Sequence, residues 1–227
     1  GSGATTGEFS NLNWSPATYQ GAVANLAVVE VGAGGDITIY NGSASFTNVV
    51  VDVEGYYLAA GAGSGTGGSG TGGSGGSAGA TYVPMSPARI VDTRCSESPL
   101  PASLSASYCA ALPTANASLS SPAGAKKIHV QVTGVGGVPD TGVAAVLVNL
   151  TFAGSFATGG YLSAYPTGSG ATTGEFSNLN WSPATYQGAV ANLAVVEVGA
   201  GGDITIYNGS ASFTNVVVDV EGYYLSG

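Results

Sequence analysis

Charged side chains are scarce in this chain of 227 residues. Asp, Glu, Lys and Arg together make up only 7% of it, against about 25% in typical soluble proteins. Only four residues are basic, and the formal net charge is −9. Binding to nucleic acid or to anionic lipid needs clustered Lys and Arg, so we expect neither function. No apolar run reaches the about 18 residues of a membrane span, and no signal peptide is visible.

Residues with catalytic or metal-binding chemistry are equally rare. There is one histidine, His129, and there are two cysteines. A structural zinc site takes four ligands, which this set does not supply. No GxSxG pattern lies between a strand and a helix, as a nucleophile elbow would require. We therefore expect a non-enzymatic protein without a metal or cofactor.

The two cysteines, Cys95 and Cys109, flank a short segment rich in Ser, Pro and Ala. We expect a disulfide between them, which would stabilise the fold by about 3 kcal/mol in the chain-entropy model. The alternative is a pair of free thiols. A disulfide and a surface coated with Ser, Thr, Asn and Gly are typical of an extracellular protein.

Helical patterns are absent too, and glycine accounts for 38 residues, which disfavours helices. Short β-branched runs with alternating polarity predict strands instead, at 22–31, 36–40, 48–57, 128–133, 144–152 and 160–165. Asn41-Gly42 lies between two of these runs and predicts a β-hairpin with a type I′ turn. The expected fold is all-β, an antiparallel β-sandwich.

A long exact repeat is what the chain does contain. Residues 1–58 are identical to residues 168–225, at an offset of 167. Residues 59–80 consist only of Gly, Ala, Ser and Thr, so they predict a flexible linker. We name residues 80–167 segment A and residues 168–225 segment B, with 1–58 as the first copy of segment B. The sequence predicts one complete module at 81–225, preceded by a duplicated C-terminal half.

Segments A and B resemble each other weakly, so the module is expected to contain two similar halves. Residues 148–152 (VNLTF) are similar to 191–195 (ANLAV), and 129–134 to 217–222. A segment of 58 residues with three or four strands leaves one sheet face uncovered. An isolated copy of segment B is therefore expected to be unstable.

Motifs along residues 81–225 resemble a repeat module of secreted and surface proteins of actinobacteria. They are YVP at 82–84, PARIVDTR at 87–94, GVP at 137–139, AVLVNLT at 145–151, GYLSAYP at 160–166, SNLNW at 177–181 and VDVEGYY at 218–224. The resemblance implies an extracellular accessory or structural module, often present in arrays. It transfers no catalytic or ligand-binding residues, and it places the module boundary near Ala80.

Two of the four basic residues lie close together in PARIVDTR. Arg89, Asp92 and Arg94 are interpreted as a buried charge clasp that fixes the first strand. The alternative is a site for a ligand or for a salt bridge between modules.

Aromatic residues beside amides form the other candidate site. Trp14, Tyr19, Trp181 and Tyr186 lie in the two copies of SNLNWSPATYQ. Such rings can bind sugar, and they are equally typical of the packed edge of a sandwich.

The leading functional hypothesis is a structural repeat of an extracellular surface or fibre protein. Half-modules would complement each other between neighbouring chains or modules, so the partner would be the protein itself or a neighbouring repeat. One alternative is a carbohydrate-binding adhesion module, with cell-wall polysaccharide as ligand. A second is an engineered duplication in which two copies of segment B compete for one segment A.

Overall fold

The computed structural model describes residues 12, 23–29, 31–57, 80–97, 100–112, 126–154, 159–171, 175–182 and 188–226. Its strands are β1 (Thr81–Asp92), β2 (Lys127–Gln131), β3 (Val143–Gly154), β4 (Gly160–Pro166), β5 (Leu179–Trp181), β6 (Gly188–Glu197), β7 (Asp203–Asn208) and β8 (Val216–Leu225). Two short helices, η1 (Thr93–Ser96) and α1 (Ala106–Ala110), follow β1.

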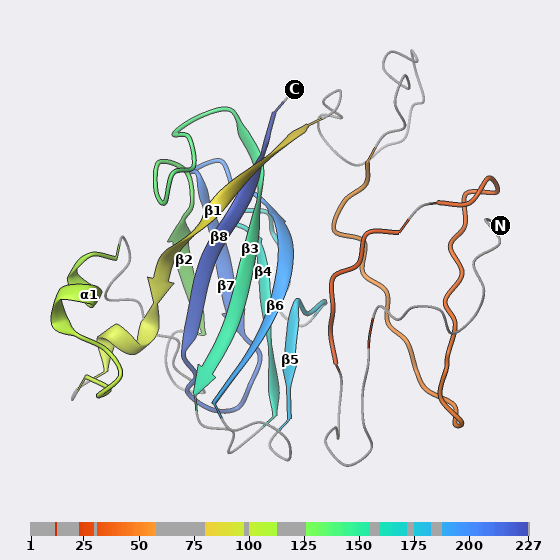
Figure 1. Ribbon diagram of the computed structural model, residues 1–227, viewed down its shortest axis with the longest axis horizontal. Helices are drawn as coiled ribbons and strands as arrows, with labels where there is room; N and C mark the ends of the chain where they lie inside the picture. The colour runs from red at the N-terminus through yellow and green to blue at the C-terminus, as the bar shows by residue number, and fades with distance from the viewer. Residues whose placement is uncertain are drawn as a thin grey trace.

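The strands form two four-stranded antiparallel sheets, as the sequence predicts. One has the order β1-β8-β3-β6 and the other β2-β7-β4-β5. Figure 1 shows the two sheets as layers, with β1, β8, β3 and β6 nearer the viewer. The all-β sandwich is therefore confirmed.

The core lies between the two sheets and is built by strand alternation. From Val146 to Phe152 on β3, every second side chain is buried, because successive side chains point to opposite faces of a strand. The largest fully buried side chains are Phe152, Ile90, Leu150, Leu162, Leu179, Ile204 and Ile206. They come from both sheets and from both segments, so the core exists only when segments A and B are together.

Strands of the two segments alternate across both sheets. Segment A supplies β1 to β4 and segment B supplies β5 to β8. The strand pairs in the described part of the chain are β1–β8, β3–β8, β3–β6, β2–β7, β4–β7 and β4–β5. Each of these pairs joins segment A to segment B. Neither segment therefore has a strand ladder of its own in this part of the chain.

The first copy of segment B shows what happens without that pairing. Its described residues, 12, 23–29 and 31–57, contain no strand, although the same sequence forms β6, β7 and β8 in the second copy. These residues are red to orange in Figure 1. Val218 is 0% exposed, but its identical counterpart Val51 is 54% exposed. Sequence alone does not make these residues strands; partners in segment A do.

Turns, in contrast, are the same in both copies. The amide of Gly32 donates to the carbonyl of Asp36 at 2.8 Å, and Gly199 donates to Asp203 at 2.9 Å. The third glycine of this turn has a φ of 81° in both copies, a backbone conformation that glycine adopts without penalty. Local interactions are enough for a turn, whereas strands need partners distant in the sequence.

The predicted hairpin at Asn41-Gly42 is wrong. In the second copy, the matching Asn208-Gly209 joins β7 in one sheet to β8 in the other. The side chain of Asn208 accepts a hydrogen bond from the Ser210 amide at 2.9 Å. Glycine is needed at 209 because a Cβ there would overlap the ring of Tyr161. Close packing against Tyr161, rather than a positive φ, therefore explains why position 209 is a glycine.

The similarity of the two halves covers only part of the topology and fails for the aligned residues. The aligned segments 129–134 and 217–222 begin on β2 and β8, which lie in different sheets, and the pairs of β8 with β1 and β3 have no equivalent. If β2 is exchanged with β5, β3 with β6 and β4 with β7, the pairs β3–β6 and β4–β7 stay the same. The pair β2–β7 then becomes β5–β4, which is also present. The alignment of 148–152 with 191–195, however, matches buried Leu150 to exposed Leu193. A shift of one residue reverses the faces of a strand, so these positions are not equivalent.

Replacement of a core residue in segment A tests this arrangement. We expect Leu150→Ala to lower the free energy of unfolding by about 2–5 kcal/mol, because it leaves a cavity between the sheets. Leu193→Ala on the neighbouring strand should cost less than about 1 kcal/mol, because this side chain is 36% exposed. Urea denaturation of both variants measures the difference, and equal losses would contradict the described core.

Candidate functional site

The contacts between segments A and B form the candidate site, and the predicted charge cluster belongs to it. Arg89 on β1 forms a two-pronged ion pair with Asp219 on β8, with Nε–Oδ1 and Nη2–Oδ2 distances of 2.8 and 3.0 Å. This hydrogen bonding to Asp219 raises the pKa of Arg89 further above its ordinary value. Arg89 therefore joins the two segments. The predicted buried clasp with Asp92 and Arg94 is wrong for this residue, because its side chain is 39% exposed and its partner is on β8.

Asp92 and Arg94 form the second part of the cluster. The side chain of Asp92 is completely buried, and Arg94 donates to it from Nε at 2.9 Å and from Nη2 at 2.6 Å. Burial raises the pKa of Asp92, but hydrogen bonds and charge from Arg94 outweigh this effect and leave the pKa below its ordinary value. The carboxylate is thus ionised inside the protein and fixes the end of β1.

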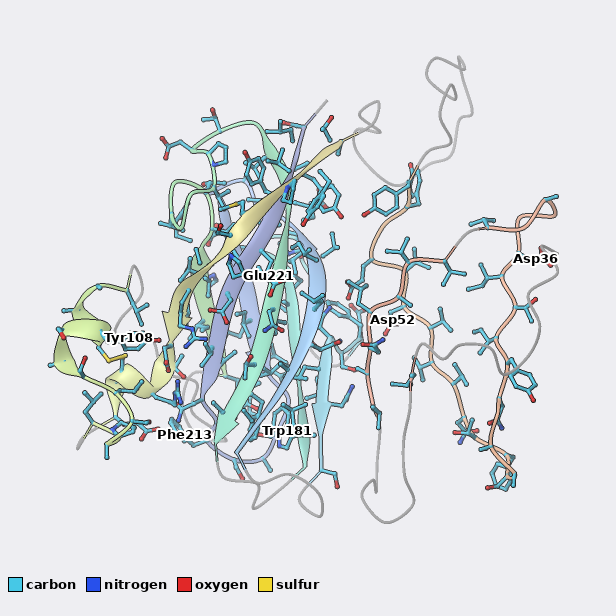
Figure 2. All side chains as sticks on the ribbon, viewed as in Figure 1. Asp36, Asp52, Tyr108, Trp181, Phe213 and Glu221 are labelled. Carbon is cyan, nitrogen blue, oxygen red and sulfur yellow. A yellow bond between two sulfur atoms is a disulfide. The ribbon has the colours of Figure 1, made fainter. Side chains whose placement is uncertain are left out.

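Tyr108 connects the two ion pairs. Its hydroxyl donates to Asp92 Oδ2 at 3.1 Å and accepts from Arg89 Nη1 at 3.2 Å. Tyr108 lies on α1, which the Cys95–Cys109 disulfide ties to the end of η1 (Figure 2). The predicted disulfide is therefore confirmed. A shallow hollow beside Tyr108 is lined by Arg89, Arg94 and 102–105, but both guanidinium groups are already engaged in ion pairs.

Thr93 and Asn215 form a further buried contact between the segments. Thr93 Oγ1 donates to Asn215 Oδ1 at 2.9 Å and accepts from the Val216 amide at 2.9 Å. Asn215 also donates to the carboxylate of Glu97. Sequence reasoning did not identify these residues. A signal was present for Asp219 alone, since a single acid interrupts the apolar run VVVDV in a chain with few charges.

The aromatic candidates do not form an exposed platform in the described residues. Trp181 is 6% exposed, and its ring stacks on Phe152 with a centroid distance of 4.2 Å. Trp181 belongs to segment B and Phe152 to segment A, so this pair is another contact between the segments. Trp14, Tyr19 and Tyr186 lie outside the described residues.

The first copy of segment B contacts the edge of the sandwich through Glu54. Glu54 Oε2 accepts from the Val195 amide on the edge strand β6 at 3.0 Å, and Oε1 accepts from Asn178 Nδ2 at 2.5 Å. Burial raises the pKa of Glu54 above its ordinary value. The Tyr57 and Tyr224 hydroxyls also lie 2.6 Å apart. These polar contacts hold the first copy beside the module without extending a sheet.

Among the described residues, no group of three or more His, Cys, Asp or Glu side chains is placed to hold a metal ion. No helix in this part of the chain is long and apolar enough to cross a membrane. Comparisons with family models, curated proteins and solved structures find no match to this chain. The resemblance to the actinobacterial repeat module thus stays a hypothesis.

Acid titration tests the Asp92 cluster. Because the folded-state pKa of Asp92 is lowered, its contribution to stability is present above its unfolded pKa of about 3.9. It is lost as the pH falls through the folded-state value. We expect Asp92→Asn to cost about 1–3 kcal/mol at pH 7, since the Arg94 donors lose their charged acceptor.

Unfolding curves between pH 2 and pH 7 measure this effect. The wild type and Asp92→Asn should converge in stability at the acidic end. Glu221→Gln is the control for the loss of one carboxyl outside the cluster. A constant stability difference between the wild type and Asp92→Asn at every pH would contradict the role of Asp92.

Proposed function

We propose that the chain is a non-catalytic structural repeat whose half-modules complement each other between neighbouring repeats or chains. The observation that carries this proposal is the alternation of segments A and B in both sheets. A copy of segment B gains its strand hydrogen bonds and its core from a segment A. Segment A is therefore the receptor of the assembly, and segment B is the part it receives.

A segment B from another chain would make the same contacts with segment A as the segment B of the same chain does. An exchange of identical segments needs no new interface, which makes domain swapping an accessible route to oligomers. β8 is central to this exchange because it lies between β1 and β3. Its apolar side chains fill the core. Asp219 on β8 and Asn215 directly before it form specific polar contacts with segment A. Strand addition of this kind gains affinity from the backbone and specificity from the side chains.

The ratio of segments leaves one copy of segment B in each chain without a segment A. The 227 residues contain one segment A and two identical copies of segment B. With one copy paired in the module, the other exposes large apolar side chains, including Val50, Val53 and Tyr56. Apolar surface of this extent marks a surface for interaction. A segment A of a neighbouring repeat or chain is the partner that fits it.

An extracellular location is part of the proposal. The disulfide supports it, because such bonds persist mainly in oxidising compartments. The low charge and the similarity to surface-protein repeats also favour a location on the cell surface or in a fibre. A carbohydrate-binding function has less support, since Trp181 is packed in the core.

Light scattering after size-exclusion chromatography tests the assembly. We expect the intact chain to form dimers or longer species as its concentration rises. Val51→Asp should abolish them, because its counterpart Val218 is buried in the core and an unpaired charge is costly there. Ala44→Asp is the matched control, because its counterpart Ala211 is exposed in the module.

The molar masses of the wild type, Val51→Asp and Ala44→Asp distinguish assembly through the first copy from its absence. Loss of the larger species in Val51→Asp but not in Ala44→Asp would support assembly through the first copy. Monomers at every concentration for the intact chain, or equal masses for all three proteins, would contradict it.

A further inference from the structure

The C-terminal end of segment B lies beside the N-terminal end of segment A. In the register of β1 and β8, Thr81 is opposite Leu225 and Tyr82 is opposite Tyr224. The rings of Tyr82 and Tyr224 are 5.1 Å apart. Figure 1 shows the start of β1 next to the C-terminus. Partners directly opposite each other on antiparallel strands have Cα atoms about 5 Å apart.

The sequence already provides a connection across this gap. Leu58 is the counterpart of Leu225 in the first copy, and residues 59–80 connect it to Thr81. A Gly/Ser-type linker of this length has a root-mean-square span of roughly 26 Å. It is therefore long enough to join two neighbouring strand ends without strain.

We propose that the first copy of segment B replaces the second copy on segment A of the same chain. The result is a permuted module, built from residues 1–58 and 80–167, that is in equilibrium with the module of residues 80–225. This inference rests on the proposed function in one respect, because both require segment A to accept any copy of segment B.

Side-chain contacts are conserved in the permuted module because the two copies are identical. Asp52 takes the place of Asp219 opposite Arg89, and Trp14 takes the place of Trp181 on Phe152. The main difference between the two folds is the closure of the linker. For 22 residues this closure favours the second copy by about 100-fold at most, since its cost scales as the 3/2 power of length. The second copy thus predominates, as the structure has it.

A substitution that prevents the second copy from pairing with segment A should therefore leave a folded module, because the first copy can take its place. Val218→Asp places a charge in the core and blocks the second copy. We expect this variant to keep a cooperative thermal transition, with its folding equilibrium constant lowered by about 100-fold at most. Val51→Asp should leave the transition unchanged. The double variant Val51→Asp/Val218→Asp should lose it, and so should Leu150→Asp, because segment A has no second copy.

A single-tryptophan readout identifies the copy that occupies segment A. In Trp181→Phe chains only Trp14 fluoresces, and in Trp14→Phe chains only Trp181 does. We expect Val218→Asp to protect Trp14 from acrylamide quenching and to expose Trp181. The inference is overturned if Val218→Asp unfolds like the double variant, or if Trp14 does not gain protection.

Mixing whole chains separates this inference from the proposed function. The Val51→Asp/Val218→Asp chain retains an intact segment A, and the Leu150→Asp chain retains two intact copies of segment B. If their mixture regains the folded transition while Val218→Asp alone does not, exchange between chains stands and exchange within one chain is wrong. If neither the mixture nor Val218→Asp alone has a folded transition, the proposed function fails as well.

Discussion

Backbone hydrogen bonding between segments A and B is the constraint on which this fold depends. Each strand pair in the described part of the chain joins one segment to the other. Buried backbone groups must be paired, so neither segment can bury its strands alone. Val218 and Val51 occupy the same position in the two copies of segment B and show the consequence. Val218 is buried in β8, whereas Val51 is exposed and lies outside any strand.

Side chains make this pairing selective. The ion pair of Arg89 and Asp219, the Thr93–Asn215 contact and the Phe152–Trp181 stack each join segment A to segment B. Tyr108 and the disulfide hold the arginine in place. A chain with few charges thus places several of them where its two halves meet, which favours recognition of the correct half over unspecific strand addition.

Patterns in the sequence predicted the all-β sandwich and the disulfide, because alternation and cysteine spacing are local properties. The strands predicted in the first copy of segment B were wrong in the described residues, because alternation does not report whether a partner strand is present. The Asn-Gly hairpin was wrong because the following strand enters the other sheet, and a turn motif does not report which sheet its strands join. The partner of Arg89 was missed because Asp219 is 130 residues away. The packing of Trp181 likewise depends on a distant strand, so its neighbours in the sequence did not distinguish a core residue from a sugar platform.

Circular dichroism of the two segments, prepared as separate polypeptides of residues 80–167 and 168–225, tests the central claim most directly. We predict that each polypeptide alone lacks a cooperative thermal transition, because it contains none of the described strand pairs. An equimolar mixture should regain the β-sheet spectrum and a cooperative transition. A cooperative transition in either polypeptide alone, or a mixture whose spectrum equals the sum of the two, would contradict the account.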